Sequence, residues 1–152
     1  MNGEEKLVKI KNQQRRIRVD QKIIKRAGEE TLKREGSSPA EVSIVLVADD
    51  YMKSLNRKYR GREESTDVLA FPMQEGEFSG IHPSLLGDVV VSVERAGEQA
   101  KEFKHELEEE LCLLTIHGIL HLLGYDDLTP KDKKRMQVRE KEILKTVFPD
   151  SN

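Results

Sequence analysis

The chain has little of what stabilises many small secreted or membrane proteins. Its single cysteine, Cys112, excludes an internal disulfide, and it has no tryptophan and only 5% aromatic residues. No apolar run approaches the ~20 residues of a membrane span. The first residues, MNGEEKLVKIKN, lack the apolar core of a signal peptide. We therefore expect a soluble, cytoplasmic protein whose stability depends on a hydrophobic core.

A large excess of either charge is also missing. The chain has 26 basic and 28 acidic residues, a formal net charge of −2, so the whole molecule does not attract nucleic acid by its charge. Basic residues nevertheless cluster in two stretches, 6–26 and 53–62. Such patches can bind a phosphate backbone, although ordinary solvated faces explain them as well, and charge alone favours the solvated faces.

The length of 152 residues, with 36% hydrophobic residues, suits one domain, which we place at 1–152. Apolar periodicity predicts an α+β fold with about four strands and about five helices. The predicted strands are 7–19, 41–48, 68–71 and 86–93. The predicted helices are 20–36, 49–59, 94–104, 106–123 and 130–148, and 74–83 is the longest irregular segment.

The segment 117–127 carries the pattern H-x-x-x-H-x-x-G-x-x-D. His117 and His121 are four residues apart on the apolar helix predicted at 106–123, so both imidazoles lie on one helix face. Gly124 can end that helix and turn the chain back, which brings Asp127 alongside as a third ligand. Three ligands leave a coordination position open, as in catalytic metal sites. The alternative is that both are core histidines with hydrogen-bond partners, but burying an imidazole without such a partner costs free energy of folding.

The spacing is that of the metzincin zinc motif with aspartate as the third ligand. Zinc proteases place a glutamate directly after the first histidine as general base, and this chain has Gly118 there. A glycine inside a helix is unfavourable, so we expect close approach by substrate or by another element at this point. A peptidase would therefore lack its general base here, although the predicted metal ligands are present.

Three blocks of the sequence resemble the YbeY family of endoribonucleases. HGILHLLGYDD matches the signature H-G-x-x-H-L-x-G-Y-D-H at every defined position except the last. NRKYRGREESTDVLAFP at 56–72 matches a second block, and Leu86-Gly87-Asp88 is a weaker third match. The resemblance implies an α+β fold with a four-stranded, mostly parallel mixed sheet and a metal site on a central apolar helix. It also implies a single-strand-specific endoribonuclease in small-subunit ribosomal RNA maturation and ribosome quality control.

The resemblance further implies zinc held by three histidines, of which His117 and His121 match two. Asp127 stands at the third position, in preference to Asp126. His₂-carboxylate sites hold catalytic zinc, but a carboxylate also makes Mn²⁺ or another divalent ion more plausible. The family's arginine corresponds to Arg60, whose implied role is to stabilise charge on the phosphoryl group. Without the family, a surface salt bridge from Arg60 to Glu63 or Glu64 would be preferred.

This reading predicts metal-assisted phosphodiester hydrolysis. Metal-bound hydroxide and the RNA 2′-hydroxyl both remain open as the nucleophile. Four basic residues are candidates for guiding the RNA strand: Arg15, Arg16, Arg57 and Lys58. With so few aromatic residues, base stacking is expected to be minor. By resemblance, the partners are ribosomal RNA, the small ribosomal subunit with its proteins, and the Era GTPase.

Two rival functions remain. One is a metallopeptidase or other metallohydrolase, favoured by the spacing and weakened by Gly118. The other is a non-catalytic ribosome-assembly factor in which the metal is largely structural. A basic groove that leads to an open metal site would favour RNA cleavage, whereas a closed site would favour the structural role.

Other polar residues receive minor roles. Asp88 is expected at a strand entry or, less favourably, as the partner of a ligating histidine. His105 beside the acidic run 106–110 is expected at a solvated helix junction, and His82 in a loop. Cys112 is expected to be a buried core thiol.

Overall fold

The apolar, β-branched segments form a single four-stranded sheet in the computed structural model, which describes residues 8–36, 41–62, 64, 66–73 and 85–151. The strands are β1 (Val8–Asn12), β2 (Glu41–Val47), β3 (Val68–Pro72) and β4 (Leu85–Ser92), in the spatial order β1-β2-β4-β3. β2 is parallel to β1 and β4, whereas β3 is antiparallel to β4. The predicted mixed, mostly parallel sheet is thus confirmed. The segment 74–83, with His82, lies outside the described residues.

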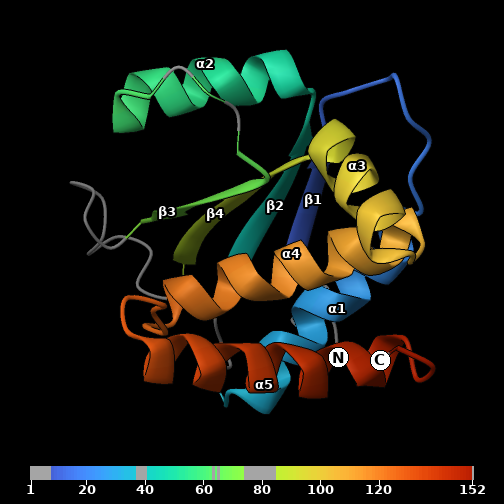
Figure 1. Ribbon diagram of the computed structural model, residues 1–152, viewed down its shortest axis with the longest axis vertical. Coiled ribbons are helices and arrows are strands. Elements are labelled where there is room, and N and C mark those ends of the chain that lie inside the picture. The colour runs from blue at the N-terminus through green and yellow to red at the C-terminus, as the bar shows by residue number, and fades with distance from the viewer. Residues whose placement is uncertain (1–7, 37–40, 63, 65, 74–84, 152) are drawn as a thin grey trace.

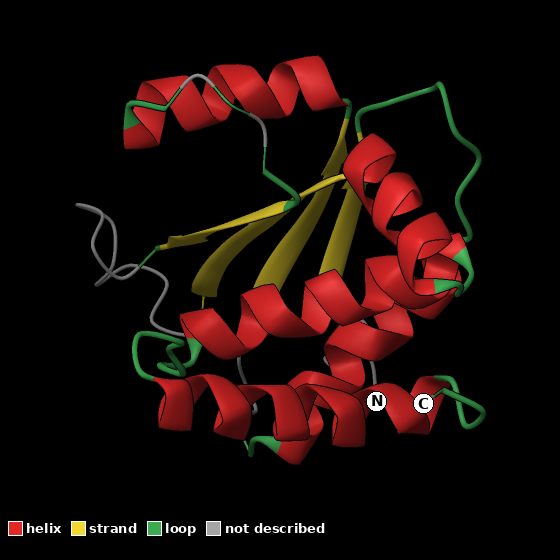
Figure 2. Ribbon diagram, viewed as in Figure 1, coloured by secondary structure: helices red, strands yellow, loops and turns green. Residues whose placement is uncertain are grey.

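Helices cover both faces of this sheet (Figures 1 and 2). They are α1 (Gln21–Arg34), α2 (Asp49–Arg60), α3 (Val93–Phe103), α4 (Leu107–Leu122) and α5 (Pro130–Val147). The main core lies between the sheet and α1 and α4, and a smaller cluster lies under α2 on the other face. α5 packs against α1 and α4 on their far side from the sheet (Figure 1). The predicted α+β class is confirmed.

The first strand is shorter than the predicted 7–19, because a side chain organises the residues after it into a loop. Gln14 is only 6% exposed. Its side-chain oxygen accepts from the main-chain N–H of Arg16 and Ile17 at 3.1 and 3.0 Å, and its amide donates to the carbonyl of Ile17 at 2.8 Å. These bonds satisfy the main chain without a neighbouring strand, so the loose alternation of the sequence does not become sheet.

Local signals set the helix ends as predicted. The side chains of Asp20 and Thr129 accept from the N–H groups of Lys22 and Asp132, both at 3.1 Å, and so cap α1 and α5. Gly124 has a φ of 106°, which suits glycine, and the Tyr125 N–H donates to the carbonyl of Leu120 at 3.0 Å. α4 therefore ends at Leu122 and the chain turns back.

Gly118 lets α4 lie directly on the sheet. A Cβ at this position would come within 2.5 Å of a methyl carbon of Val89 on β4. The close approach predicted from the glycine is therefore made by another element of the fold. Among the described helices, none combines the length and apolar character needed to cross a membrane.

Candidate metal centre

One face of α4 presents two imidazoles to the same point. The ring centres of His117 and His121 are 4.7 Å apart, with the ring planes at 78°. Their side chains are 28% and 31% exposed, although the residues around them on α4 are mostly buried. The two histidines thus lie at the border of the core, where one side of each ring meets solvent.

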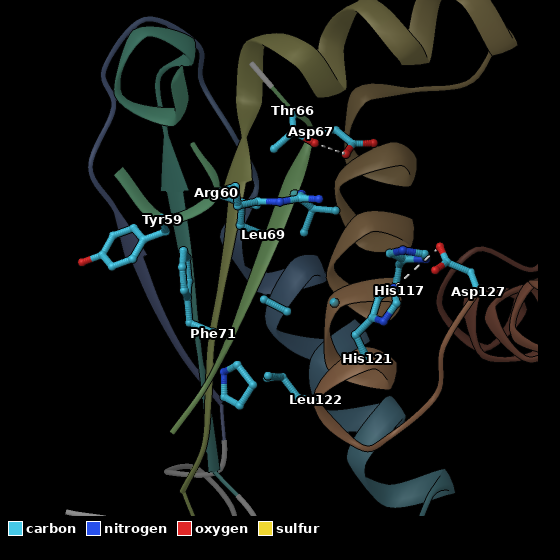
Figure 3. A pocket seen from close by; sticks show the side chains of 14 residues that line it. Tyr59, Arg60, Thr66, Asp67, Leu69, Phe71, His117, His121, Leu122 and Asp127 are labelled. Carbon is cyan, nitrogen blue, oxygen red and sulfur yellow. Dashed lines mark hydrogen bonds and ion pairs between the residues drawn. The ribbon is translucent and has the colours of Figure 1, made fainter. Parts of the chain in front are cut away.

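The turn after Gly124 brings a carboxylate to the same point. Asp127 Oδ2 lies 3.9 Å from Nε2 of His121, and one ligand atom from each of His117, His121 and Asp127 falls within 4.8 Å of the others (Figure 3). Asp126 is not part of this cluster, and its carboxylate accepts from the N–H of Leu128 at 3.2 Å. The structure therefore brings together the three residues predicted as ligands.

A fourth residue, which sequence analysis missed, orients one of the rings. Glu140 on α5 is 7% exposed, and its Oε2 pairs with Nδ1 of His117. An ionised carboxylate can only accept, so Nδ1–H donates, and in the neutral ring Nε2 keeps a free lone pair. Carboxylate–histidine–metal triads use this arrangement. Glu140 lies among the buried residues of α5, which include Met136, Ile143 and Leu144. A single acid within that apolar stripe was the available signal.

The charges around His117 act on its protonation. Burial lowers the pKa of the ring, but the hydrogen bond and charge of Glu140, together with the charges of Asp127 and Asp67, outweigh burial. The net result is a pKa above the ordinary histidine value. The three carboxylates thus favour positive charge at this point, which suits a bound cation.

The cluster opens into a pocket of about 730 Å³. Its walls are the end of α2, residues 66–72 along β3, the histidine face of α4, and Asp127. Arg60, the last residue of α2, extends across the pocket toward α4 (Figure 3). Within the described part of the chain Arg60 forms no ion pair, so the alternative of a salt bridge to Glu64 is not realised; Glu63 lies outside it.

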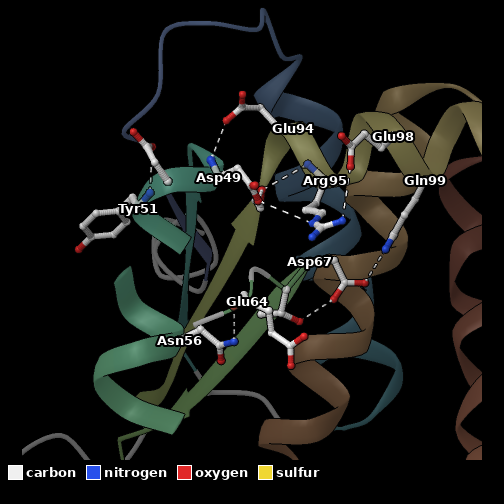
Figure 4. A network of polar contacts seen from close by, with 12 residues as sticks. Asp49, Tyr51, Asn56, Glu64, Asp67, Glu94, Arg95, Glu98 and Gln99 are labelled. Atoms are coloured by element: carbon white, nitrogen blue, oxygen red, sulfur yellow. Dashed lines mark hydrogen bonds and ion pairs between the residues drawn. The ribbon is translucent and has the colours of Figure 1, made fainter. Parts of the chain in front are cut away.

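Polar contacts hold the segment that leads from Arg60 into β3 (Figure 4). The amide of Asn56 donates to the carbonyl of Glu64 at 2.6 Å. The amide of Gln99 on α3 donates to Asp67 at 3.1 Å, and the Asp67 carbonyl accepts from the N–H of Ser92 at 2.9 Å. α2, α3 and β4 thus fix the segment that joins Arg60 to β3 along the pocket wall.

The four residues predicted to guide RNA do not gather at one place. Arg57 and Lys58 are exposed in the last turn of α2, beside Arg60. Arg16 lies near the other end of α2, roughly 18 Å away by helix length, and pairs with Glu94 at 3.3 Å. Arg15 is exposed in the same loop. Only Arg57 and Lys58 are near the pocket, and the assignment of all four to RNA binding stays a prediction.

The less favoured role of Asp88, as the partner of a ligating histidine, was wrong, and Asp88 lies in the first half of β4. Asp88 lies beside Val90 in a pocket on the α2 face of the sheet, whereas its neighbour Val89 faces α4, so strand alternation directs Asp88 away from the histidines. His105 lies at the junction of α3 and α4, as predicted; its side chain is 21% exposed, and the ring contacts Glu110 at 2.7 Å and Glu109 at 3.2 Å. Cys112 is fully buried, as predicted.

Comparisons with known proteins identify relatives of this chain. The family model described as "Endoribonuclease YbeY" matches residues 9–147. A protein of that name from Pelotomaculum thermopropionicum is 46% identical, with 90% of this chain and 94% of the relative covered. One from Carboxydothermus hydrogenoformans is 42% identical, with 91% and 95% covered. The solution structure of TM1509 from Thermotoga maritima superposes with a TM-score of 0.65 at 29% identity, covering 94% of this chain and 90% of that one.

Proposed function

Because the chain belongs to the YbeY family of endoribonucleases, we propose that it hydrolyses phosphodiester bonds in single-stranded RNA, with one divalent metal ion held by His117, His121 and Asp127. The observation that carries this proposal is that the three-ligand cluster and Arg60 face each other across one pocket. A cation and a guanidinium on opposite walls suit a phosphate group between them.

The donor set fits such an ion. Two imidazoles and one carboxylate form a known catalytic zinc set, and the cluster opens into the pocket rather than into the core. Zn²⁺ is our first choice, and Mn²⁺ or another divalent ion is the alternative because Asp127 is a harder ligand than histidine. A divalent ion bound here would lower the pKa of a bound water and polarise a phosphoryl oxygen.

The chain's own residues have separate tasks. Glu140 holds the His117 ring so that Nε2 points to the cluster. Arg60 binds the scissile phosphate and offsets the negative charge that develops on it. Arg57 and Lys58, on the exposed turn beside Arg60, attract the RNA backbone, and we assign the same long-range role to Arg15 and Arg16.

The rival functions are less well supported. A peptidase would need a general base at the position of Gly118, where the packing against Val89 leaves no room for a side chain. A purely structural metal site would be closed, whereas this cluster lines a pocket. The relatives that match nearly the whole chain carry the name of an endoribonuclease.

In the cell, we propose that the substrate is small-subunit ribosomal RNA and that the protein acts in ribosome quality control in the cytoplasm. The small ribosomal subunit, its proteins and the Era GTPase are the partners that follow from this role. These assignments are supported by the family to which the chain belongs.

The test is cleavage of a single-stranded RNA by metal-analysed protein, with casein as a control substrate. His121→Ala and Arg60→Glu should abolish cleavage while melting as the wild type does. Arg34→Ala is a matched control, since this exposed arginine of α1 has only an i,i+4 pair with Glu30 at 3.6 Å. If the two site variants cut as fast as the wild type, the activity is a contaminant and the assembly-factor role takes first place.

A further inference from the structure

The pocket wall opposite the histidines is an unpaired sheet edge. Among the strands in the described part of the chain, β3 is the last of the sheet and pairs with β4 alone. The Asp67 carbonyl accepts from the N–H of Ser92, and the N–H of Met73 donates to the carbonyl of Leu86, both at 2.9 Å. These two bonds show which residues between 67 and 73 turn their main-chain groups toward β4.

In an antiparallel pair, every second residue turns its N–H and C=O to the neighbouring strand. Because residues 67 and 73 bond to β4, the main-chain N–H and C=O groups of Leu69 and Phe71 also point to β4. Those of Val68 and Ala70 point to the open side of the strand. Both residues line the metal pocket, and within the described part of the chain nothing bonds their main-chain groups. The edge therefore offers donors and acceptors beside the metal cluster.

An exposed aromatic ring continues this edge. Tyr59 is 57% exposed and lines the same pocket. Its ring meets the ring of Phe71 edge-on, with centres 5.2 Å apart, and the Lys58 ammonium lies 5.3 Å from the Tyr59 centre. In Figure 3 both aromatic rings lie on the opposite side of β3 from the histidines. A strand leaving the metal cluster must cross the open edge to reach Tyr59.

We propose that the open edge of β3 and the Tyr59 ring form a subsite for unpaired nucleotides next to the scissile phosphate. This inference rests on the proposed function and names how the site recognises its substrate. The main chain of Val68 and Ala70 hydrogen-bonds the edge of one base, and Tyr59, supported by Phe71, stacks against the next base. Bases in a duplex have their pairing edges occupied and their faces stacked, so the subsite accepts only single strands.

Charge favours RNA over an extended peptide as the occupant. Arg60 and Lys58 flank Tyr59 in the chain, and basic side chains beside an aromatic ring are typical of single-strand nucleic-acid sites. At Pro72 a peptide adding to this edge would find an acceptor but no donor, since proline has no N–H. An extended peptide that competes with RNA for cleavage would overturn the proposal.

The experiment compares kcat/KM for single-stranded RNA between wild type and Tyr59→Ala, using a series of RNAs with one abasic position each. We expect Tyr59→Ala to lower kcat/KM about tenfold, mainly through KM, as loss of one base–aromatic stack would. At one position near the cut, the abasic RNA should lower wild-type kcat/KM by the same factor. For Tyr59→Ala, kcat/KM should be the same with and without that base, because the tyrosine and the base form one contact and either change removes it. Tyr51→Ala, an exposed tyrosine two turns earlier on α2, is the matched control and should behave as wild type.

Ala70→Pro tests the main chain. It removes an N–H that makes no ladder bond, and proline is tolerated on edge strands. We expect kcat/KM to fall about fivefold, as for one lost hydrogen bond, and to fall by less in Ala70→Ser, which keeps the N–H. Strictly additive effects of Tyr59→Ala and every abasic site, with RNA cleavage intact in wild type, would overturn this inference alone. A wild type that cuts no RNA overturns the proposed function and the subsite with it.

Discussion

Glu140 on α5 pairs with His117 on α4, although 23 positions separate them in the sequence. Each has a low exposed fraction, 10% for the carboxylate side chain and 28% for the imidazole. The contact joins the outermost helix of the fold to the candidate metal ligand nearest the middle of α4. The orientation of one ligand thus depends on the packing of two helices.

Glu140→Gln should weaken metal binding by about ten- to a hundredfold, the range found when the carboxylate partner of a ligating histidine is removed. Glutamine keeps the shape but can also donate, so it no longer fixes the histidine hydrogen on Nδ1. Competition with a chelator for Zn²⁺ measures the affinity. Glu142→Gln on the same helix is the control, because Glu142 is 57% exposed and far from the cluster in the helix register. Equal affinities for wild type and Glu140→Gln would remove Glu140 from the site.

Replacement of Asp127 should change which metal is preferred. Asp127→His replaces the carboxylate by a softer, neutral ligand, and we expect the ratio of Zn²⁺ to Mn²⁺ affinity to rise. Asp127→Asn should weaken both ions, since it removes the negative charge. Asp126→Asn should change neither affinity, because Asp126 only accepts from the Leu128 N–H. Titration of each purified variant with each ion gives the comparison, and an effect at Asp126 alone would reassign the third ligand.

Gly118→Ala should destabilise the protein even though alanine favours helix. The added Cβ would meet Val89 at 2.5 Å, and such overpacking typically costs about 1–3 kcal/mol. Gly97→Ala is the opposite case, since its Cβ meets only Leu107 at 3.9 Å in the interior of α3, and it should stabilise by about 0.5–1 kcal/mol. Urea unfolding measures both. Val89→Ala combined with Gly118→Ala should lose less stability than the two single changes added together, and strict additivity would show that the methyl contact is not the cause.

Cys112 should be inert in the folded protein. Burial raises the pKa of its thiol to about 12, and the nearby charges of Glu108, Asp20 and Glu109 act in the same direction. The nucleophilic thiolate is therefore scarce at neutral pH, and the sulfur is fully buried. As the chain has a single cysteine, an aromatic disulfide reagent reports on this site alone. We expect no reaction until the protein unfolds, and fast labelling of folded protein would contradict the packing of α4.

The sequence predicted best what local interactions decide. Asp20 and Thr129 cap helices through their own neighbours, and Gly124 ends α4 through its own backbone, so all three were readable without the fold. His117 and His121 were readable because helix geometry places residues four apart on one face. Arg60 was found only through resemblance, since no local rule brings the end of α2 to α4.

What could not be predicted depends on which elements meet. Glu140 reaches His117 only because α5 packs on α4, and Asp88 faces away only because of the register of β4 with its neighbours. The role of β3 as an open edge follows from the strand order, which periodicity does not reveal. The low aromatic content pointed away from base stacking, yet Tyr59 stands at the pocket. A composition says how many rings a chain has and nothing about where they lie.

The position of α5 outside α4 has a consequence for synthesis of the protein. A ribosome completes α4, with both histidines and Asp127, before Glu140 has been added. The orienting carboxylate joins the site only when α5 docks on α4, so a nascent chain that has completed α4 still carries an unfinished site. Synthesis of the three ligands and completion of the metal site are thus separate events, and the metal affinity of the site would rise only after α5 has been made.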